Sequence, residues 1–242
     1  MTQPAPLSPS PLHRALALAE RALFLTPPNP RVGCVITGTD GAVLGEGHTQ
    51  AVGGPHAEVM ALRDAAARGH EVRGATVWVT LEPCAHFGRT PPCCDALAAA
   101  GVGRVVVTNV DPNPRVAGAG IARLRAAGVV VDLLPQDDPL ALASRELNIG
   151  FFCRMVRGRP WVRLKVAAST DGRTALPNGV SQWITSPEAR SDGHRWRARA
   201  CAVLTGAGTV LADDPRLDAR GVDAPRQPHA VVLDSQLRTP PT

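Results

Sequence analysis

The stretch TLEPCAHFGRTPPC, residues 80–93, contains two cysteines, Cys84 and Cys93, each directly preceded by a proline. Cys84 follows 75–81, a short apolar run of the kind that forms a buried strand. Cys93 lies near the start of 91–100, which has helical spacing. Two thiols placed between a strand end and a helix start favour a metal site over ordinary buried cysteines.

The third candidate ligand is His56, at the start of a helix predicted over 56–68, with Gly69 as its C-cap. Three nitrogen and sulfur ligands leave the fourth position of a zinc ion open for water, whose pKa the metal lowers. Glu58 lies two residues beyond His56, so its carboxylate can take a proton from that water and deliver it to a leaving amine. The pattern predicts a catalytic zinc bound by His56, Cys84 and Cys93, with Glu58 as the catalytic proton shuttle.

The order H-x-E followed by P-C-x-x-C is typical of zinc deaminases, but here eight residues separate the cysteines instead of two. The longer loop adds Arg89 and Thr90 beside the predicted metal. A structural zinc site is the alternative; it needs four protein ligands, and His86 or Cys94 could supply the fourth. Cys94 could also replace Cys93. The other cysteines are expected to be ordinary buried thiols: Cys34, Cys153 and Cys201.

Strand and helix patterns alternate around this stretch. The predicted helices are 12–25, 56–68, 91–100, 118–127 and 139–153. The predicted strands are 32–37, 42–47, 75–81, 104–108 and 129–133, with a hairpin turn at 39–41. This alternation predicts an α/β sandwich with a largely parallel sheet.

The composition changes at 154–160 (RMVRGRP), a basic segment that we interpret as a linker. Beyond it we expect a strand at 161–167, a helix at 187–199, a strand at 201–205, a loop at 221–228 and a strand at 230–234. The predicted organisation is a disordered tail at 1–10, a zinc deaminase domain at 11–153 and, at 161–242, the first part of an incomplete domain, since the segment ends soon after a strand.

The composition restricts the classes of partner. With 44% hydrophobic and 19% charged residues, the chain can build a packed core. A net charge of +5, with only 3% aromatic residues, fits a small phosphorylated substrate better than nucleic acid. We find neither a membrane-spanning apolar run nor a signal-peptide pattern, so we expect no membrane partner and a cytoplasmic protein with reduced thiols. We also expect a homo-oligomer.

Several motifs resemble one family, the bifunctional riboflavin-biosynthesis deaminase–reductases. Residues 80–93 carry the resemblance most specifically, and 29–33 (NPRVG), 55–58 (PHAE) and 111–114 (DPNP) share it. Segments similar to the family's reductase domain follow at 165–173 (KVAASTDGR), 181–186 (SQWITS) and 209–215 (TVLADDP). The resemblance covers nearly the whole chain after the predicted tail.

The resemblance implies a three-layer cytidine-deaminase-like domain followed by a dihydrofolate-reductase-like α/β domain. The first removes the 2-amino group of 2,5-diamino-6-ribosylamino-4(3H)-pyrimidinone 5′-phosphate as ammonia, and the second reduces the ribosyl group to ribityl with NADPH. The family's reductase domain runs on for roughly another hundred residues. The resemblance therefore implies a truncated reductase here, either a fragment of a longer product or a degenerate domain.

In the deaminase domain, Asn29 has an amide suited to a pyrimidine edge or a ribose hydroxyl. Arg89 and Thr90 are suited to hold the 5′-phosphate. Asp111 and Asn113 follow the carboxyl end of a predicted strand, where ligands bind in such sheets. Turn formation is the alternative role for Asn29 and for the two residues after the strand.

In the reductase domain, the family pattern carries over position by position. It implies NADP contacts for Ala167, Trp183, Thr209, Asp213 and Ser235. It implies substrate contacts for Ser181, Arg197, Leu217 and Arg220. The alternatives are a core position for Trp183 and a solvated helix face for Arg197.

The leading hypothesis is the riboflavin-pathway deaminase. A second enzymatic hypothesis is deamination of another base or of adenosine in tRNA, against which the Arg89–Thr90 loop and the added domain argue. The third is a non-catalytic structural zinc protein. Ammonia release from the ribotide or from tRNA separates the first two, and the effect of Glu58→Gln separates both from the third.

Overall fold

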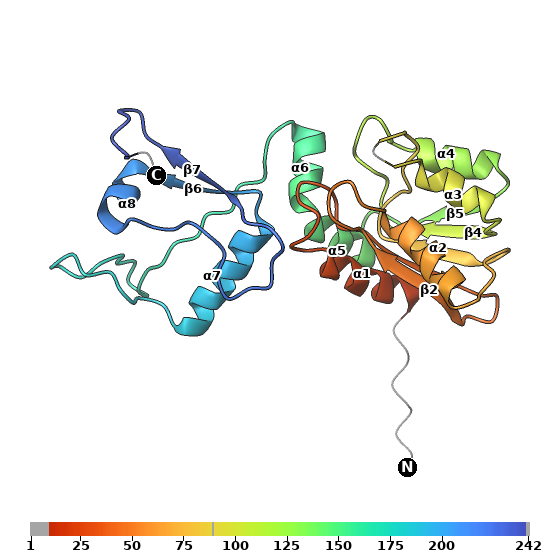
Figure 1. Cartoon of the computed structure of the whole chain (residues 1–242), viewed down its shortest axis with the longest axis horizontal. Helices are drawn as coiled ribbons and strands as arrows, with labels where there is room; N and C mark the ends of the chain where they lie inside the picture. The colour runs from red at the N-terminus through yellow and green to blue at the C-terminus, as the bar shows by residue number, and fades with distance from the viewer. Residues whose placement is uncertain (1–9, 89, 241–242) are drawn as a thin grey trace, which may run out of the picture. The chain divides into compact units, whose positions relative to one another are not determined.

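The computed structural model describes residues 10–88 and 90–240 (Figure 1). The chain forms two compact units, Met1–Trp161 and Val162–Thr242. Residues 1–9 of the predicted tail lie outside the described residues, whereas Ser10 caps the first helix by accepting a hydrogen bond from the His13 backbone N–H. Within the described part of the chain, no helix has the length and apolar character needed to cross a membrane.

A five-stranded sheet forms the centre of the first unit, in the order β2-β1-β3-β4-β5. Its strands are β1 (Gly33–Thr37), β2 (Val43–His48), β3 (Thr76–Val79), β4 (Arg104–Val107) and β5 (Val130–Leu133). β3, β4 and β5 run parallel, but β1 is antiparallel to both β2 and β3. Four of the five strands, β2 to β5, thus run in the same direction, so the predicted largely parallel sheet holds except at β1. The predicted hairpin at 39–41 is confirmed, and it reverses the chain between β1 and β2.

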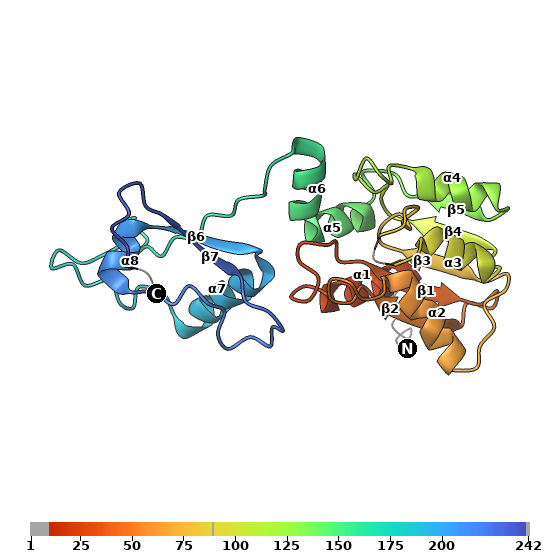
Figure 2. The ribbon, with the colours of Figure 1, turned by 45° about the horizontal axis from the view of Figure 1, so that its top comes forward.

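Helices cover both faces of this sheet, which confirms the predicted three-layer sandwich (Figure 2). They are α1 (Pro11–Arg21), α2 (Ala57–Ala67), α3 (Cys93–Ala99), α4 (Ala119–Ala126), α5 (Pro139–Leu147) and α6 (Ile149–Arg157). Alternate residues of β1 pack in opposite directions, because side chains of a strand alternate between faces. Cys34 and Ile36 join the core that includes α2, α3 and α4, whereas Val35 packs with α1.

Helix α2, which follows His56 and carries Glu58, lies very close to β2. A Cβ added to Gly45 would be 2.4 Å from the Ala61 carbonyl oxygen, and one added to Gly47 would be 2.8 Å from the Ala57 carbonyl oxygen. Neither backbone atom can move away without displacing the helix. The two glycines thus fix the distance between α2 and the sheet, and with it the place of Glu58.

The region 139–153 is helical as predicted, but Asn148 divides it into two helices, α5 and α6. The fully buried side chain of Asn148 accepts a hydrogen bond from the Arg31 N–H at 2.7 Å and donates one to the Arg31 carbonyl at 2.9 Å. These bonds hold the chain at the junction between α5 and α6. Helix α6 then continues four residues into the predicted linker and ends at Gly158, whose φ of 66° suits a glycine.

The second unit contains α7 (Pro187–Arg199), β6 (Ala202–Gly206), α8 (Ala207–Asp213) and β7 (His229–Leu233), with β6 and β7 parallel. The prediction of a strand over 161–167 is wrong. Val162 and Leu164 are 77% and 85% exposed, and among the described residues no strand pairs with this segment. Helix α8 was not predicted from the sequence.

We predict that Gly47→Ala lowers the free energy of unfolding by about 1–3 kcal/mol, because the methyl group overlaps α2. Urea denaturation followed by circular dichroism measures the change. Gly150→Ala is the matched control. Gly150 lies in helix α6, and a Cβ added there meets nothing within 4 Å. Equal stability of the Gly47→Ala protein and the wild type would contradict the close-packing argument.

Candidate metal centre

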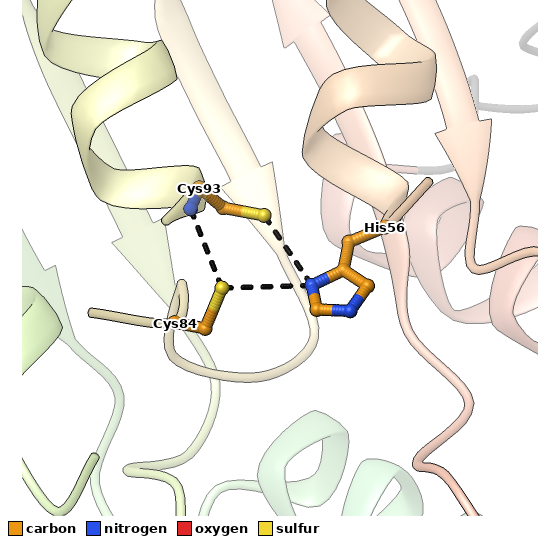
Figure 3. A group of neighbouring side chains, drawn as sticks. All are labelled: His56, Cys84 and Cys93. Carbon is orange, nitrogen blue, oxygen red and sulfur yellow. Dashed lines mark hydrogen bonds between the residues drawn. The ribbon is translucent and has the colours of Figure 1, made fainter. Parts of the chain in front are cut away.

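Three side chains from separate segments converge at one end of the sheet (Figure 3). His56 immediately precedes α2, Cys84 lies in the loop after β3, and Cys93 is the first residue of α3. The His56 Nδ1 atom is 3.5 Å from the Cys84 Sγ atom and 3.4 Å from the Cys93 Sγ atom. All three ligand atoms lie within 4.8 Å of one another. The structure thus brings the three predicted ligands together.

These distances fit a tetrahedral zinc ion. Zn–S and Zn–N bonds of ordinary length place the sulfur and nitrogen atoms about 3.6 Å apart. The N-terminal ends of α2 and α3 are at the site, and the positive end of a helix favours thiolate ligands. In addition, the Cys93 backbone N–H donates to the Cys84 sulfur at 3.3 Å. Both the donor set and its spacing are therefore suited to zinc.

The two thiols form a coupled pair. The hydrogen bond with the Cys93 side chain, helped by His56, lowers the pKa of Cys84 to about 4. The same contact and burial raise the pKa of Cys93. Without a metal, the Cys93 thiol therefore keeps its proton beside a Cys84 thiolate, and a divalent cation bound between the two sulfurs would favour loss of that proton as well.

No fourth ligand from the described residues joins this group. His86 lies outside the cluster of ligand atoms, and the sulfur of Cys94 is 3.6 Å from an Asp95 carboxylate oxygen. The structural-site alternative, which requires four protein ligands, is therefore not supported by the described residues. Among the other thiols, Cys34 and Cys153 are buried as expected, but Cys201 is exposed, and that prediction is wrong. Cys201 directly precedes β6, where it is left uncovered.

Glu58 lies in the first turn of α2 with only 3% of its surface exposed. Burial raises the pKa of its carboxyl group to about 7. The charge of the nearby His56 and the Cys93 side chain lower this pKa, but burial outweighs them. A carboxyl group with a pKa near neutrality, beside the candidate ligands, can both accept and return a proton.

A cavity of about 420 Å³ opens beside these residues, a volume in the range of small-molecule sites. Besides His56, Glu58 and Cys84, it is lined by the described residues predicted to bind the deaminase substrate: Asn29, Thr90, Asp111 and Asn113. Arg89, the remaining predicted residue, lies outside the described residues. The proposed turn roles also hold, since the Asn29 N–H donates to the Thr26 carbonyl and the Asn113 N–H to an Asp111 carboxylate oxygen.

Among the described residues predicted to bind the deaminase substrate, Asp111 is the one whose pKa is clearly shifted by its surroundings. Its side chain is almost completely buried, and burial raises the pKa of its carboxyl group to about 6. The Asn113 N–H, 2.8 Å from an Asp111 oxygen, opposes this shift. Asp111 thus offers the cavity a carboxyl group that is able to donate or accept a hydrogen bond near neutral pH.

The sequence analysis did not predict that helix α6 lines the cavity. Phe151, Arg154 and Met155 of α6 line it, although Arg154 had been assigned to a linker. Their spacing of three and four residues is the signal that places them on one helical face. Arg154 makes no ion pair with any described residue, so its guanidinium group is free to meet an anion.

In the second unit, part of the predicted reductase substrate set lies together. Arg197 donates to the Asp218 carbonyl oxygen at 3.1 Å, and Arg220 makes an ion pair with the Asp218 carboxylate. Leu217, next in the chain to Asp218, is buried. Ser181 is exposed in a segment without helix or strand. Arg197 is thus half-buried and bonded, not simply a solvated helix residue.

The predicted cofactor residues of the second unit are more dispersed. Thr209 and Asp213 belong to α8, Ser235 follows β7, and Ala167 lies in a segment without regular structure. Trp183 is 70% exposed under the Arg190 guanidinium, so a core position for this ring is excluded. Among the described residues, no side-chain hydrogen bond or ion pair joins these five residues to one another.

Comparisons with known proteins match both units. Residues 10–109 match the cytidine and deoxycytidylate deaminase zinc-binding region, and residues 160–242 match the RibD C-terminal domain. The riboflavin biosynthesis protein RibD of Escherichia coli (strain K12) is 52% identical over 94% of this chain and 63% of its own length. RibD of Aquifex aeolicus is 46% identical over 93% of this chain and 61% of its own length.

Among solved structures, too, those similar to this chain include RibD proteins. Acinetobacter baumannii RibD, form 1, superposes with a TM-score of 0.87 at 48% identity, covering 95% of this chain and 64% of that one. The diaminohydroxyphosphoribosylaminopyrimidine deaminase/5-amino-6-(5-phosphoribosylamino)uracil reductase of Thermotoga maritima gives a TM-score of 0.86 at 41% identity, over 93% of this chain and 62% of that one. The chain spans less than two thirds of the length of these relatives. In sequence and in fold, both units of this chain are therefore similar to the corresponding parts of RibD proteins.

Proposed function

We propose that the first unit catalyses the zinc-dependent hydrolytic deamination of 2,5-diamino-6-ribosylamino-4(3H)-pyrimidinone 5′-phosphate in riboflavin biosynthesis. The observation that carries this proposal is the convergence of His56, Cys84 and Cys93 beside the buried carboxyl group of Glu58. Similarity to RibD proteins over 94% of the chain supports the choice of substrate. The reaction replaces the ring amine with oxygen from water and releases ammonia.

In this mechanism His56, Cys84 and Cys93 would hold the metal, which when bound would supply a Lewis acid that lowers the pKa of a water molecule toward neutrality. The Glu58 carboxylate accepts a proton from the attacking water and gives a proton to the departing amine, which leaves as ammonia. Its pKa of about 7 suits both directions of transfer.

The substrate's ring and phosphate need different partners. Asn29, Asp111 and Asn113 line the cavity with amide and carboxyl groups that suit a pyrimidine edge or ribose hydroxyls. For the phosphate we propose Thr90 and Arg89, whose side chains suit an anion, together with Arg154. Among the described cavity residues, Arg154 is the one side chain that stays cationic at every physiological pH.

Two alternatives are weaker. Deamination of another base or of tRNA adenosine is disfavoured by the matches to RibD proteins along nearly the whole chain. A non-catalytic zinc protein is disfavoured by the three-ligand set and by the cavity beside it. Ammonia release from the ribotide, compared with release from tRNA, distinguishes the first alternative.

For the second unit we propose a part in the NADPH-dependent reduction of the ribosyl group to ribityl. The match of residues 160–242 to the RibD C-terminal domain supports this proposal. Titration of the protein with NADPH, followed by its fluorescence, tests it. Saturable binding supports the proposal, and no binding at millimolar NADPH contradicts it for this chain.

We further propose that the protein acts in the cytoplasm as a homo-oligomer. All six cysteines are free thiols, which fits a reducing compartment. Light scattering on the purified protein measures the oligomeric state.

We predict that Glu58→Gln lowers kcat for ammonia release by at least about 100-fold, because the amide cannot transfer protons. Bound zinc, measured by mass spectrometry, stays at the wild-type level. Glu71→Gln, at an exposed residue beyond α2, is the control and leaves kcat unchanged. Ammonia release that survives Glu58→Gln would refute the role of this residue.

Removal of one ligand is expected to release the metal. After dialysis, Cys84→Ser retains far less zinc than the wild type, because a hydroxyl is a much poorer zinc ligand than a thiolate. Cys94→Ser, which changes the thiol next to Cys93, keeps wild-type zinc content, because its sulfur faces Asp95. Zinc loss in Cys94→Ser but not in Cys84→Ser would overturn the ligand assignment.

The phosphate role of Arg154 predicts a selective change in KM. Arg154→Ala raises KM for the ribotide about tenfold, the effect of losing one solvent-exposed charged hydrogen bond, with little change in kcat. Arg157→Ala, one turn further along α6, serves as the control. If KM is the same in both proteins, Arg154 does not bind the phosphate.

A further inference from the structure

Glu82 is a buried acidic residue that the deamination mechanism does not use. Only 3% of its surface is exposed, and no Lys or Arg among the described residues pairs with it. Instead its two oxygens accept four backbone hydrogen bonds. Oε2 accepts from the Asp111 and Gly118 N–H groups at 3.0 and 2.9 Å, and Oε1 accepts from Gly120 and Ile121 at 2.9 and 3.1 Å.

These bonds connect two segments of the site. Glu82 lies two residues before the ligand Cys84, in the loop after β3. Asp111 begins the cavity loop after β4, and Gly118 and Gly120 lie at the start of α4. One side chain therefore joins the metal-ligand loop, the substrate loop and the N-terminal end of a helix.

We call the set of hydrogen bonds around Glu82 the Glu82 junction. The backbone packing on the α4 side of this junction is also tight. A Cβ added to Gly120 would lie 1.9 Å from the Pro83 carbonyl oxygen and 3.2 Å from Glu82 Oε1. The start of α4 thus rests directly on the peptide between Glu82 and Cys84. A shift of α4 away from this peptide would therefore displace the Asp111–Asn113 loop relative to Cys84.

The chemistry of the junction requires a carboxylate. Four N–H donors need an acceptor group with two oxygens, each able to accept two hydrogen bonds. A carboxamide offers one oxygen and turns its own N–H donors toward the two remaining backbone donors. Burial of a charge without a cationic partner is unfavourable unless such bonds compensate it.

We propose that Glu82 is a positioning residue of the deaminase site, which fixes the Asp111–Asn113 loop relative to Cys84. The proposal rests on the proposed function, because Asp111 and Asn113 matter only if the cavity binds the ribotide. Glu82 itself does not touch the reacting atoms. It acts through the backbone of the loop that does.

Steady-state kinetics of the zinc-loaded Glu82→Gln protein tests this role. We expect KM for the ribotide to rise about tenfold while kcat changes by less than about threefold and zinc content is unchanged, because the cavity loop moves but Glu58 and the ligands remain. Asp138→Asn is the matched control. It makes the same chemical change where a carboxylate caps α5 through the Leu140 and Ala141 N–H groups, and it leaves KM unchanged.

Hydrogen exchange provides a readout that does not depend on turnover. In Glu82→Gln the amides of Asp111, Gly118, Gly120 and Ile121 should exchange at least about tenfold faster, while those of β4 keep wild-type protection. If Glu82→Gln fails to fold, Gly120→Ala replaces it, because its methyl group pushes α4 from Pro83 and should raise KM in the same way.

The outcomes separate the two proposals. A wild-type protein that releases no ammonia from the ribotide refutes the proposed function. In that case hydrogen exchange of the four amides still tests whether Glu82 holds the two loops together: unchanged exchange rates in Glu82→Gln would overturn this role. If the wild type is active, an unchanged KM in Glu82→Gln overturns the positioning role. Equal losses of kcat and zinc overturn it as well, since they would show a general structural role.

Discussion

Three chain segments must hold their side chains within a few ångströms of one point for the metal centre to exist. The segments are the residue before α2, the loop after β3 and the first residue of α3. The sheet provides the common edge, but the distances depend on tight backbone packing. Gly45 and Gly47 let α2 approach β2, and Gly120 lets α4 approach the loop that carries Cys84. The geometry of the metal centre therefore depends on three glycine positions, where any larger side chain would push a helix away.

Much of the site could be predicted from the sequence because its chemistry is local. The zinc ligands and the proton shuttle can be recognised from residue type and spacing alone, because few residue types bind zinc. The pattern is a histidine, a carboxylate two residues later and two Pro-Cys pairs. The hairpin at 39–41 and most helices of the first unit follow from turn residues and from periodicity. These are properties of neighbouring residues, and they do not depend on which distant segment the chain meets.

The parts that sequence reasoning missed depend on distant partners. The break between α5 and α6 arises from hydrogen bonds between Asn148 and Arg31, which are far apart in the chain. The run at 161–167 alternates like a strand, yet a strand also needs a neighbour, and no described strand pairs with it. Arg154 stands in a basic segment with a glycine and a proline, which has a linker's composition, and only the fold places it at the cavity.

The position of α6 has a consequence for dissecting the protein. A shortened protein that ends at residue 153, where the sequence suggests a boundary, would retain the three candidate ligands and Glu58. It would lack Arg154 and Met155, and the helix carrying Phe151 would lose its last turn and its glycine cap. Such a protein could bind metal yet leave its pocket open to solvent on one side. A minimal version of the first unit should therefore extend at least through Gly158, and metal content alone would be a misleading criterion for its integrity.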